Sequence, residues 1–182
     1  IQYGTSMCYP VSSMGSHVSV VPNHQLNRKT PLHTRANVAY FGTFGYELDL
    51  NKLSYEEISE VKQQIAFMKE YRELIQFGTF YRLKSPFEGN ETAWMTVSED
   101  KKTALVFWYR ERNVVNADFT RVRLQGLDPD FIYRNEYNGT ENYGDELMNL
   151  GLLTTDCTAG EPTSEDEPCT DYESRIYVLT AK

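Results

Sequence analysis

Two kinds of hydrophobic pattern divide the chain near residue 78. Apolar side chains recur at helical spacing between Tyr55 and Phe77, whereas from Thr79 onward apolar and polar residues alternate in short runs. A period of 3.6 residues predicts an amphipathic helix, and a period of two predicts half-buried strands. The sequence therefore predicts two parts of different architecture, an α/β part over 1–78 followed by an all-β part over 79–182.

The helix predicted over Tyr55–Phe77 has recognisable ends. Ser54 and Glu57 have the spacing of a capping box, in which each side chain accepts a hydrogen bond from the other residue's backbone N–H. Gly78 favours termination. One face of the predicted helix is apolar and consists of Ile58, Val61, Ile65, Met68, Leu74 and Ile75. A helix with such a face needs a sheet or another helix on which to bury it.

The residues before this helix predict strands and one short helix. We expect strands over Met7–Ser13 and Asn37–Phe44, separated by a polar loop over 22–31 and a short helix near Pro31–Ala36. Two strands and a long helix cannot cover a parallel sheet on both faces. The α/β part is therefore expected to depend on strands outside this chain, and the start at Ile1 rather than Met also suggests a piece of a longer protein.

The second part predicts a small antiparallel β-sandwich. Turn sequences separate its strands, among them Asn138-Gly139, a dipeptide favoured in two-residue hairpins. The predicted strands are Phe80–Leu83, Glu91–Val97, Thr103–Tyr109, Thr120–Leu124, Phe131–Glu136, Thr140–Tyr143 and Ser174–Thr180. The acidic stretch 156–173 lacks Lys and Arg and is expected to be a solvated insertion.

The composition narrows the range of partners and cofactors. The 182 residues include 26 acidic residues against 18 Lys and Arg, a net charge of −8 that argues against nucleic acid or an anionic membrane as the partner. The three histidines and three cysteines form no ligand motif, so no metal is expected. Cys8 is expected to be buried as a small hydrophobe, and Cys157 and Cys169 are expected to be free thiols.

Ser16 and His17 form the first candidate for chemistry. They follow Gly15, but the nucleophile motif G-x-S-x-G would need a glycine where Val18 stands, so a catalytic serine is not favoured. Glu47 and Asp49 form the second candidate, because a pair of carboxylates is what glycoside hydrolysis requires. The simpler interpretation places both in the turn that leads into the long helix.

Aromatic side chains form the third candidate. Trp94, Trp108 and Tyr109 could make a platform on which a sugar stacks, although in a sandwich such residues more often pack the core. The glycosylation sequons at Asn90 and Asn138 indicate surface turns.

Many stretches of the chain resemble the α-galactosidases (melibiases) of glycoside hydrolase family 36, over about residues 1–150. The residues that carry the resemblance are Tyr3–Ser6, Tyr9–Ser19, Val21–Gln25, Arg28, Thr30–Leu32, Thr34–Arg35, Phe44–Leu50, Gln64–Phe67, Tyr81–Leu83, Ser85–Phe87 and Gly144–Met148. The resemblance implies that 1–78 are the last two βα units of a (β/α)8 TIM barrel and that 79–182 are the C-terminal antiparallel β-sandwich domain.

The resemblance also implies an activity. Family members hydrolyse terminal α-galactosyl residues of the melibiose and raffinose type with retention, using an aspartate nucleophile and an aspartate acid/base and no cofactor. Both aspartates are expected upstream of Ile1, so this chain alone is expected to be inactive. Ser16 and His17, in the loop after the penultimate barrel strand, are the candidate substrate-binding residues at the rim of the cleft. The alternative for both is a structural role, in which they hold the loop by hydrogen bonds.

The expected partners follow from the same resemblance. They are a galactoside oligosaccharide and, for the full-length enzyme, further copies in a homo-oligomer; a cytoplasmic location is also expected. The alternative hypothesis is a non-catalytic module that binds carbohydrate or supports oligomerisation.

Overall fold

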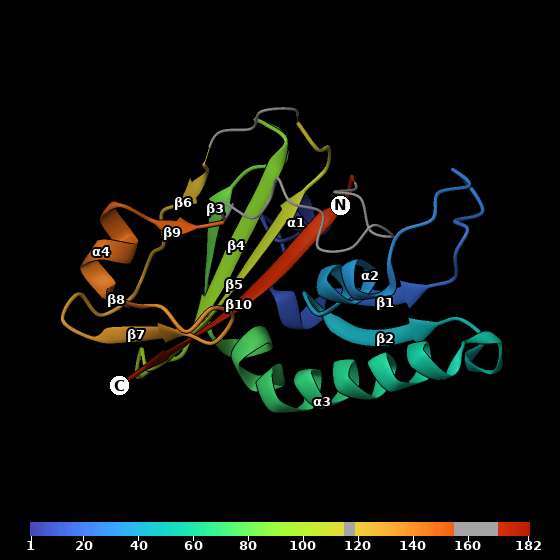
Figure 1. The fold of residues 1–182 in the computed structure, drawn as a ribbon, viewed down its shortest axis with the longest axis horizontal. Coiled ribbons are helices and arrows are strands. Elements are labelled where there is room, and N and C mark those ends of the chain that lie inside the picture. The colour runs from blue at the N-terminus through green and yellow to red at the C-terminus, as the bar shows by residue number, and fades with distance from the viewer. Residues whose placement is uncertain (115–118, 155–170) are drawn as a thin grey trace. The chain divides into compact units, whose positions relative to one another are not determined.

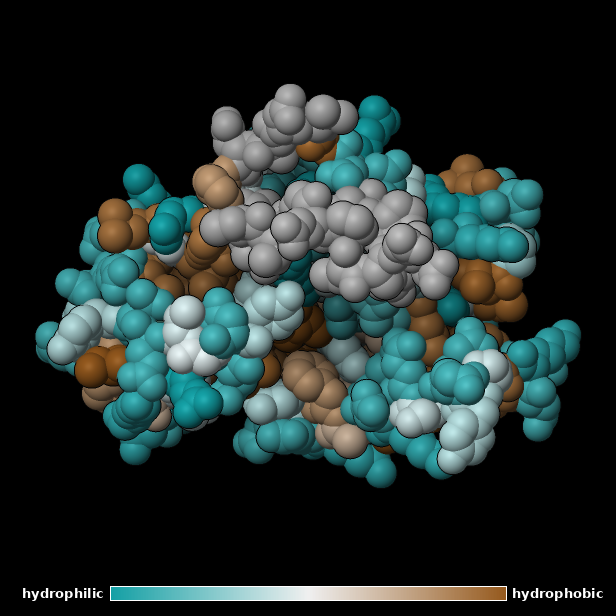
Figure 2. All heavy atoms as spheres, in the orientation of Figure 1, coloured by the Kyte–Doolittle hydropathy of each residue, from teal (hydrophilic) through white to brown (hydrophobic). Residues whose placement is uncertain are grey.

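The computed structural model of the chain contains two compact units, unit 1 (Ile1–Gly78) and unit 2 (Thr79–Lys182) (Figure 1). The long helix α3 (Tyr55–Phe77) is the last element of unit 1. The structure describes residues 1–114, 119–154 and 171–182. Figure 2 shows hydrophilic side chains over most of the visible described surface, with hydrophobic side chains in separate patches.

Unit 1 is built on a parallel pair of strands, β1 (Gly15–Ser19) and β2 (Thr43–Glu47). Residues at equal positions pair, from Gly15 opposite Thr43 to Ser19 opposite Glu47. The helix α2 (Leu32–Ala39) connects the two strands, and α3 follows β2. Short helical segments complete the unit: α1 (Gln2–Thr5), η1 (Val11–Ser13) and η2 (Leu50–Lys52).

The prediction for α3 is confirmed. The backbone N–H of Ser54 donates to the Glu57 carboxylate (2.8 Å), and the Glu57 N–H donates to Ser54 Oγ (3.2 Å). Val61, Met68 and Ile75 of the predicted apolar face are buried, and the helix ends at Phe77.

Both strands predicted for unit 1 are wrong. Met7–Ser13 contains Pro10, which has no N–H to donate to a sheet, and the chain forms turns and η1 there instead. Asn37–Phe44 begins inside α2, because the short helix predicted near Pro31–Ala36 continues to Ala39 and buries its apolar end. Cys8 lies in the turn after α1 and is exposed, so its predicted burial is also wrong.

Unit 2 contains a six-stranded, fully antiparallel sheet in the order β3-β4-β5-β10-β7-β8. The C-terminal strand β10 lies between β5 and β7, which precede it by many residues. The strands are β3 (Thr79–Lys84), β4 (Glu91–Val97), β5 (Thr103–Arg110), β7 (Ile132–Asn135), β8 (Glu141–Tyr143) and β10 (Glu173–Ala181), so all six of these strand predictions are confirmed within two residues at each end.

The second layer of unit 2 is smaller than the sheet expected for a sandwich. Residues 120–124 pair with another strand only as β6 (Arg121–Val122), opposite β9 (Leu152–Leu153). The next hydrogen bond runs from the Leu124 N–H to the carbonyl of Leu147 (3.1 Å), which belongs to the helix α4 (Gly144–Asn149). A short ribbon, a loop and a helix thus replace a full second sheet.

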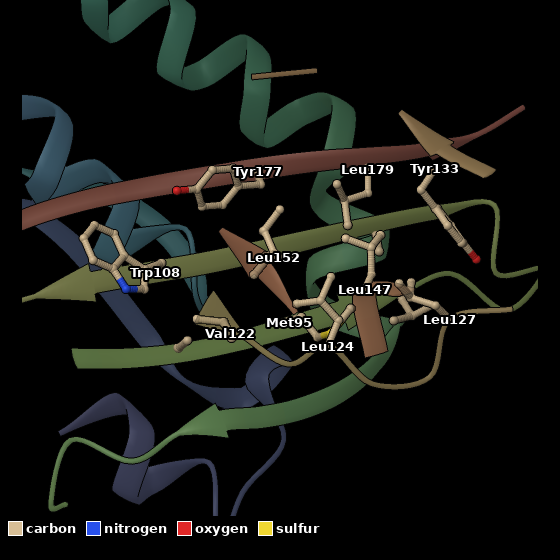
Figure 3. Packing of buried hydrophobic residues seen from close by; sticks show 14 residues of the cluster. Met95, Trp108, Val122, Leu124, Leu127, Tyr133, Leu147, Leu152, Tyr177 and Leu179 are labelled. Atoms are coloured by element: carbon tan, nitrogen blue, oxygen red, sulfur yellow. The ribbon is translucent and has the colours of Figure 1, made fainter. Parts of the chain in front are cut away.

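The core of unit 2 lies between the large sheet and this second layer. Met95, Trp108 and Tyr177 point from the sheet toward Leu124 and Leu152 of the covering segments (Figure 3). All of these side chains are at least 95% buried. The domain is therefore a mostly antiparallel sheet with its own hydrophobic core. The stretch 155–170, which contains Cys157, Cys169 and most of the predicted acidic insertion, lies outside the described residues.

Candidate functional site

The parallel pair β1–β2 has one covered face and one open face. Side chains of β1 alternate, so Ser16 and Val18 are buried while Gly15, His17 and Ser19 are exposed. On β2, Phe44 stacks on Tyr40 at the end of α2, with ring centroids 4.9 Å apart. The helices therefore cover the Ser16 face. The opposite face, which carries His17 in register with Gly45, is the candidate functional site.

The structure separates the two residues predicted for the cleft rim. Both lie within β1 rather than in a loop after a strand, so that expected position is corrected. Ser16 is buried, and its hydroxyl donates to the carbonyl of Ala39 at the end of α2. Ser16 thus fastens the strand to the helix layer, whereas His17 lies on the open face.

The imidazole of His17 lies low over two glycines. A Cβ placed on Gly45 would lie 3.1 Å from Cδ2 of His17 and 3.7 Å from Nε2, and a Cβ placed on Gly15 would lie 3.8 Å from Cε1. Both edges of the ring are therefore close to the sheet. Sequence reasoning missed Gly45, because only the register of β1 with β2 brings it beside His17.

Close backbone approach fixes the start of the site. The N–H of Thr43 donates to the carbonyl of Met14 (2.7 Å). A Cβ on Gly42 would lie 2.6 Å from that same carbonyl oxygen and 2.5 Å from the Ser16 hydroxyl. A glycine at residue 42 is thus what allows β2 to begin beside β1.

Arg35 of α2 holds the other end of β1. Its guanidinium donates to the carbonyl of Ser19 (2.6 Å) and to that of Thr30 (3.0 Å), so the loop that follows β1 is tied at both ends. Burial lowers the pKa of Arg35 from its ordinary value, and the nearby carboxylates of Glu57 and Glu60 oppose that shift. The two backbone bonds thus fix the strand end and the loop relative to each other.

Three polar side chains are linked by hydrogen bonds on the helix-covered face of the β1–β2 pair. The Tyr46 hydroxyl donates to the amide oxygen of Gln64 (2.7 Å), and the Gln64 amide nitrogen donates to the carboxylate of Glu60 (2.7 Å). Burial, with a smaller contribution from Glu60, raises the pKa of Tyr46 to about 12. These bonds explain why Gln64 is buried on a helix face whose other buried residues are apolar.

Glu47 and Asp49 do not share one role. Glu47 ends β2 on the open face and is exposed, in register with Ser19. Asp49 caps η2, because its carboxylate accepts from the backbone N–H of Asn51 (3.0 Å) and from the Asn51 amide (3.0 Å). Asp49 thus belongs to the turn that leads into α3, and only Glu47 stands beside the His17 face.

The aromatic candidates in unit 2 do not form a common platform. Ala93 pairs with Trp108 and Trp94 pairs with Phe107, so the two tryptophans project from opposite faces of the sheet. Trp108 is fully buried in the core, and Trp94 is 4% exposed and packs on Tyr109 with ring centroids 4.9 Å apart. These residues pack the fold and cannot stack together on one sugar.

The two sequons differ in what their asparagines do. The Asn90 side chain bonds twice to the backbone of Arg112, through its amide nitrogen (2.7 Å) and its oxygen (2.9 Å). Asn138 is exposed, and its oxygen accepts from the Thr140 hydroxyl (2.8 Å). Both asparagines lie at turns or strand ends.

Neither a cluster of metal-ligating side chains nor a helix fit to span a membrane occurs in the part of the chain that is described. Within residues 1–114, 119–154 and 171–182, no three His, Cys, Asp or Glu side chains gather where they could hold a metal ion. None of the helices in those ranges is both long and apolar enough to span a bilayer.

Comparison with known families assigns both parts of the chain. The model of the family described as Melibiase matches residues 1–78, and the model of the glycosyl hydrolase family 36 C-terminal domain matches residues 91–179. Together the two matches cover most of the chain.

Two known proteins with similar sequences are α-galactosidases. The chain is 55% identical over 152 residues to α-galactosidase AgaA of Geobacillus stearothermophilus, covering 84% of this chain and 21% of AgaA. It is 46% identical over 181 residues to α-galactosidase 1 of Pediococcus pentosaceus, covering 100% of this chain and 23% of that protein. The chain thus spans less than a quarter of the length of these relatives.

A solved structure has the same fold along the whole chain. The crystal structure of an AgaA variant in complex with raffinose superposes with a TM-score of 0.89 at 48% identity, covering 100% of this chain and 24% of that one. The fold of each unit is therefore one already known from experiment.

Proposed function

Because the chain belongs to glycoside hydrolase family 36, we propose that it forms the end of the catalytic barrel and the C-terminal domain of an α-galactosidase. The observation that carries this proposal is the pair of family matches, one on each unit. The proposed reaction is hydrolysis of terminal α-galactosyl residues with retention, by a carboxylate nucleophile and a carboxyl acid/base. The proposed substrates are galactosides of the melibiose and raffinose type.

The layout of unit 1 supports its proposed place in a (β/α)8 TIM barrel. Parallel strands β1 and β2 are each followed by a helix, and the helices cover one face of the pair. In such barrels the other face of each strand points into the interior, and functional side chains gather toward the carboxyl ends of the strands. Glu47 meets both conditions, since it ends β2 on the open face, and His17 lies on the same face at the middle of β1.

The two carboxylates that perform the reaction are proposed to lie outside this chain. Asp49 caps η2 and is thereby committed to the fold, which leaves Glu47 as the single carboxylate of the former pair on the open face. The chain is proposed to supply the closing wall of the cleft. There His17 contacts the galactoside, and Ser16 holds β1 in place through Ala39.

Activity measurements test this division of labour. Purified 1–182 should release no nitrophenol from p-nitrophenyl α-galactoside, whereas the longer protein that contains it should hydrolyse this substrate, melibiose and raffinose. Turnover by 1–182 alone would disprove the proposed position of the catalytic carboxylates. Inactivity of the longer protein on all three galactosides would disprove the proposed function itself.

Assembly of the longer enzyme into a homo-oligomer is the second part of the proposal. It rests on the resemblance to the family and is tested separately. Sedimentation velocity of the longer protein should give a mass that is a multiple of one chain, and a monomer over the working concentration range would contradict it.

A further inference from the structure

Gly45 has no backbone reason to be glycine. Among the described glycines, positive φ angles occur at Gly42, Gly126, Gly139 and Gly151, and Gly45 is not one of them. A glycine inside a strand weakens it, because it adds chain entropy to the unfolded state and contributes no side chain to packing. The choice of glycine at residue 45 therefore needs another explanation.

The imidazole of His17 supplies that explanation. Of the atoms in the described ranges, those within 4 Å of a Cβ built on Gly45 are Cδ2 and Nε2 of His17, at 3.1 and 3.7 Å. The first distance is tighter than an ordinary van der Waals contact, so an alanine would push against the ring and a larger residue would occupy its place. Gly45 thus leaves room for one specific side chain from the neighbouring strand.

The low position of the ring gives it a definite orientation. Cε1 lies near the Cβ position of Gly15 while Cδ2 lies near that of Gly45, so the imidazole crosses from β1 toward β2. A ring in this position turns one of its faces away from the sheet. The α-carbon of Glu47 lies two residues beyond that of Gly45 on β2, about 7 Å further along the strand, and its side chain belongs to the same face.

We propose that Gly45 is a positioning residue that holds the His17 imidazole down on the β1–β2 sheet, so that the free face of the ring stacks on the galactosyl ring. This inference rests on the proposed function for the identity of the sugar. An aromatic face offers apolar contact to the C–H side of a sugar, and the carboxylate of Glu47 is an acceptor within reach of a hydroxyl on the same sugar.

Proton NMR of the longer protein that contains residues 1–182, with isotopically labelled histidine and glycine, tests the positioning without any need for activity. The unsubstituted chain should show a nuclear Overhauser effect between Hδ2 of His17 and the α-protons of Gly45. In Gly45→Val the imidazole of His17 should be displaced, and its Hδ2 and Hε1 resonances should change chemical shift. Gly89→Ala is the matched control, because a Cβ at residue 89 meets nothing within 4 Å. Unmoved His17 resonances in Gly45→Val would overturn the inference, whatever the enzyme does.

Kinetics of the longer protein tests the contact with sugar. Gly45→Val and His17→Ala should each raise KM for p-nitrophenyl α-galactoside several-fold with a smaller change in kcat, and Gly89→Ala should change neither. His17→Phe, which keeps a flat ring, should recover most of the affinity lost in His17→Ala. An unchanged KM in an active Gly45→Val enzyme would overturn the stacking role. If the unsubstituted longer protein were inactive, the proposed function would fail, while the NMR result would still decide the positioning.

Discussion

Gly144 is the residue at which unit 2 tolerates a side chain least. Its N–H donates to the carbonyl of Phe131 (2.9 Å), and its α-carbon faces the loop before β7 so closely that a Cβ would lie 1.9 Å from the carbonyl oxygen of Asp128. No side-chain rotation can relieve a contact with backbone. Only a residue without a Cβ therefore fits at the start of α4.

Gly144→Ala should lower the free energy of unfolding of the chain by about 2–3 kcal/mol, the cost typical of overpacking at a site that cannot yield. Urea unfolding followed by tryptophan fluorescence measures the change. Gly89→Ala is the control, since its added Cβ meets nothing within 4 Å. A Gly144→Ala variant as stable as this control would show that the loop at Asp128 moves aside freely.

The pKa of Tyr177 predicts a loss of stability at high pH. Burial of the phenol raises its pKa to about 12, against a contribution from Arg175 that lowers it. In the unfolded chain the Tyr177 phenol ionises near pH 10. Between about pH 10 and 12 the unfolded chain therefore releases a proton from Tyr177 that the folded chain retains. The free energy of unfolding should therefore fall over this range, by up to about 2–3 kcal/mol from this residue, and should not depend on Tyr177 below about pH 10.

Urea midpoints at a series of alkaline pH values check this expectation. Tyr177→Phe removes the ionisable group and should flatten part of the decline, although it also loses the 3.3 Å hydrogen bond to Thr154 and so starts from a lower stability. Tyr55→Phe is the control, because that side chain is 85% exposed. Equal slopes for Tyr177→Phe and Tyr55→Phe would contradict the assignment.

At the scale of elements, the capping box is the local device that starts α3. Ser54→Ala removes the acceptor for the Glu57 N–H and should cost about 1 kcal/mol of stability. Ser59→Ala is the matched control on an exposed helical position, where alanine has the higher helix propensity. Far-UV circular dichroism during thermal unfolding separates the two variants, and equal melting temperatures would mean that the cap is dispensable.

Local signals explain why α3 could be predicted from the sequence and β1 could not. The helix has caps and a repeating apolar face, all within one segment. In β1 the buried positions are Ser16 and Val18, so one of the two buried side chains is polar and the strand shows no alternation of apolar and polar residues. The Ser16 hydroxyl can be buried because it donates to a carbonyl of α2. Most antiparallel strands of unit 2 can be predicted because they carry several apolar residues and end at a turn, whereas β8, with the sequence Glu-Asn-Tyr, is indicated mainly by the Asn138-Gly139 turn before it.

The sequence identified one residue of the candidate site, His17, but not the residues that surround it in the fold. His17 stood out in the sequence, but its neighbour Gly45 is 28 positions away and comes beside it only through the parallel register. The insertion of β10 between β5 and β7 is hidden for the same reason, since nothing in residues 173–181 specifies their partners. Patterns along the chain reveal elements, whereas pairing between distant segments depends on how their surfaces fit.

At the scale of the whole molecule, each unit has its own buried centre and its own optical signal. Both tryptophans belong to unit 2, whereas most helical residues belong to α2 and α3 of unit 1. Tryptophan fluorescence therefore reports on unit 2, and helical circular dichroism reports mainly on unit 1. This separation allows substitutions in one unit to be followed in both.

Leu179→Ala and Ile75→Ala should act on different transitions. Leu179 is 1% exposed in β10, the strand that joins β5 to β7, and Ile75 is 1% exposed in α3. Each truncation should cost about 2–5 kcal/mol, because it removes buried methyl groups and leaves a cavity. Leu179→Ala should lower the urea midpoint seen by fluorescence, and Ile75→Ala the midpoint seen by circular dichroism. If either variant shifts both midpoints equally, the two units unfold as one cooperative structure. The boundary at Gly78 would then separate two compact units that do not unfold independently.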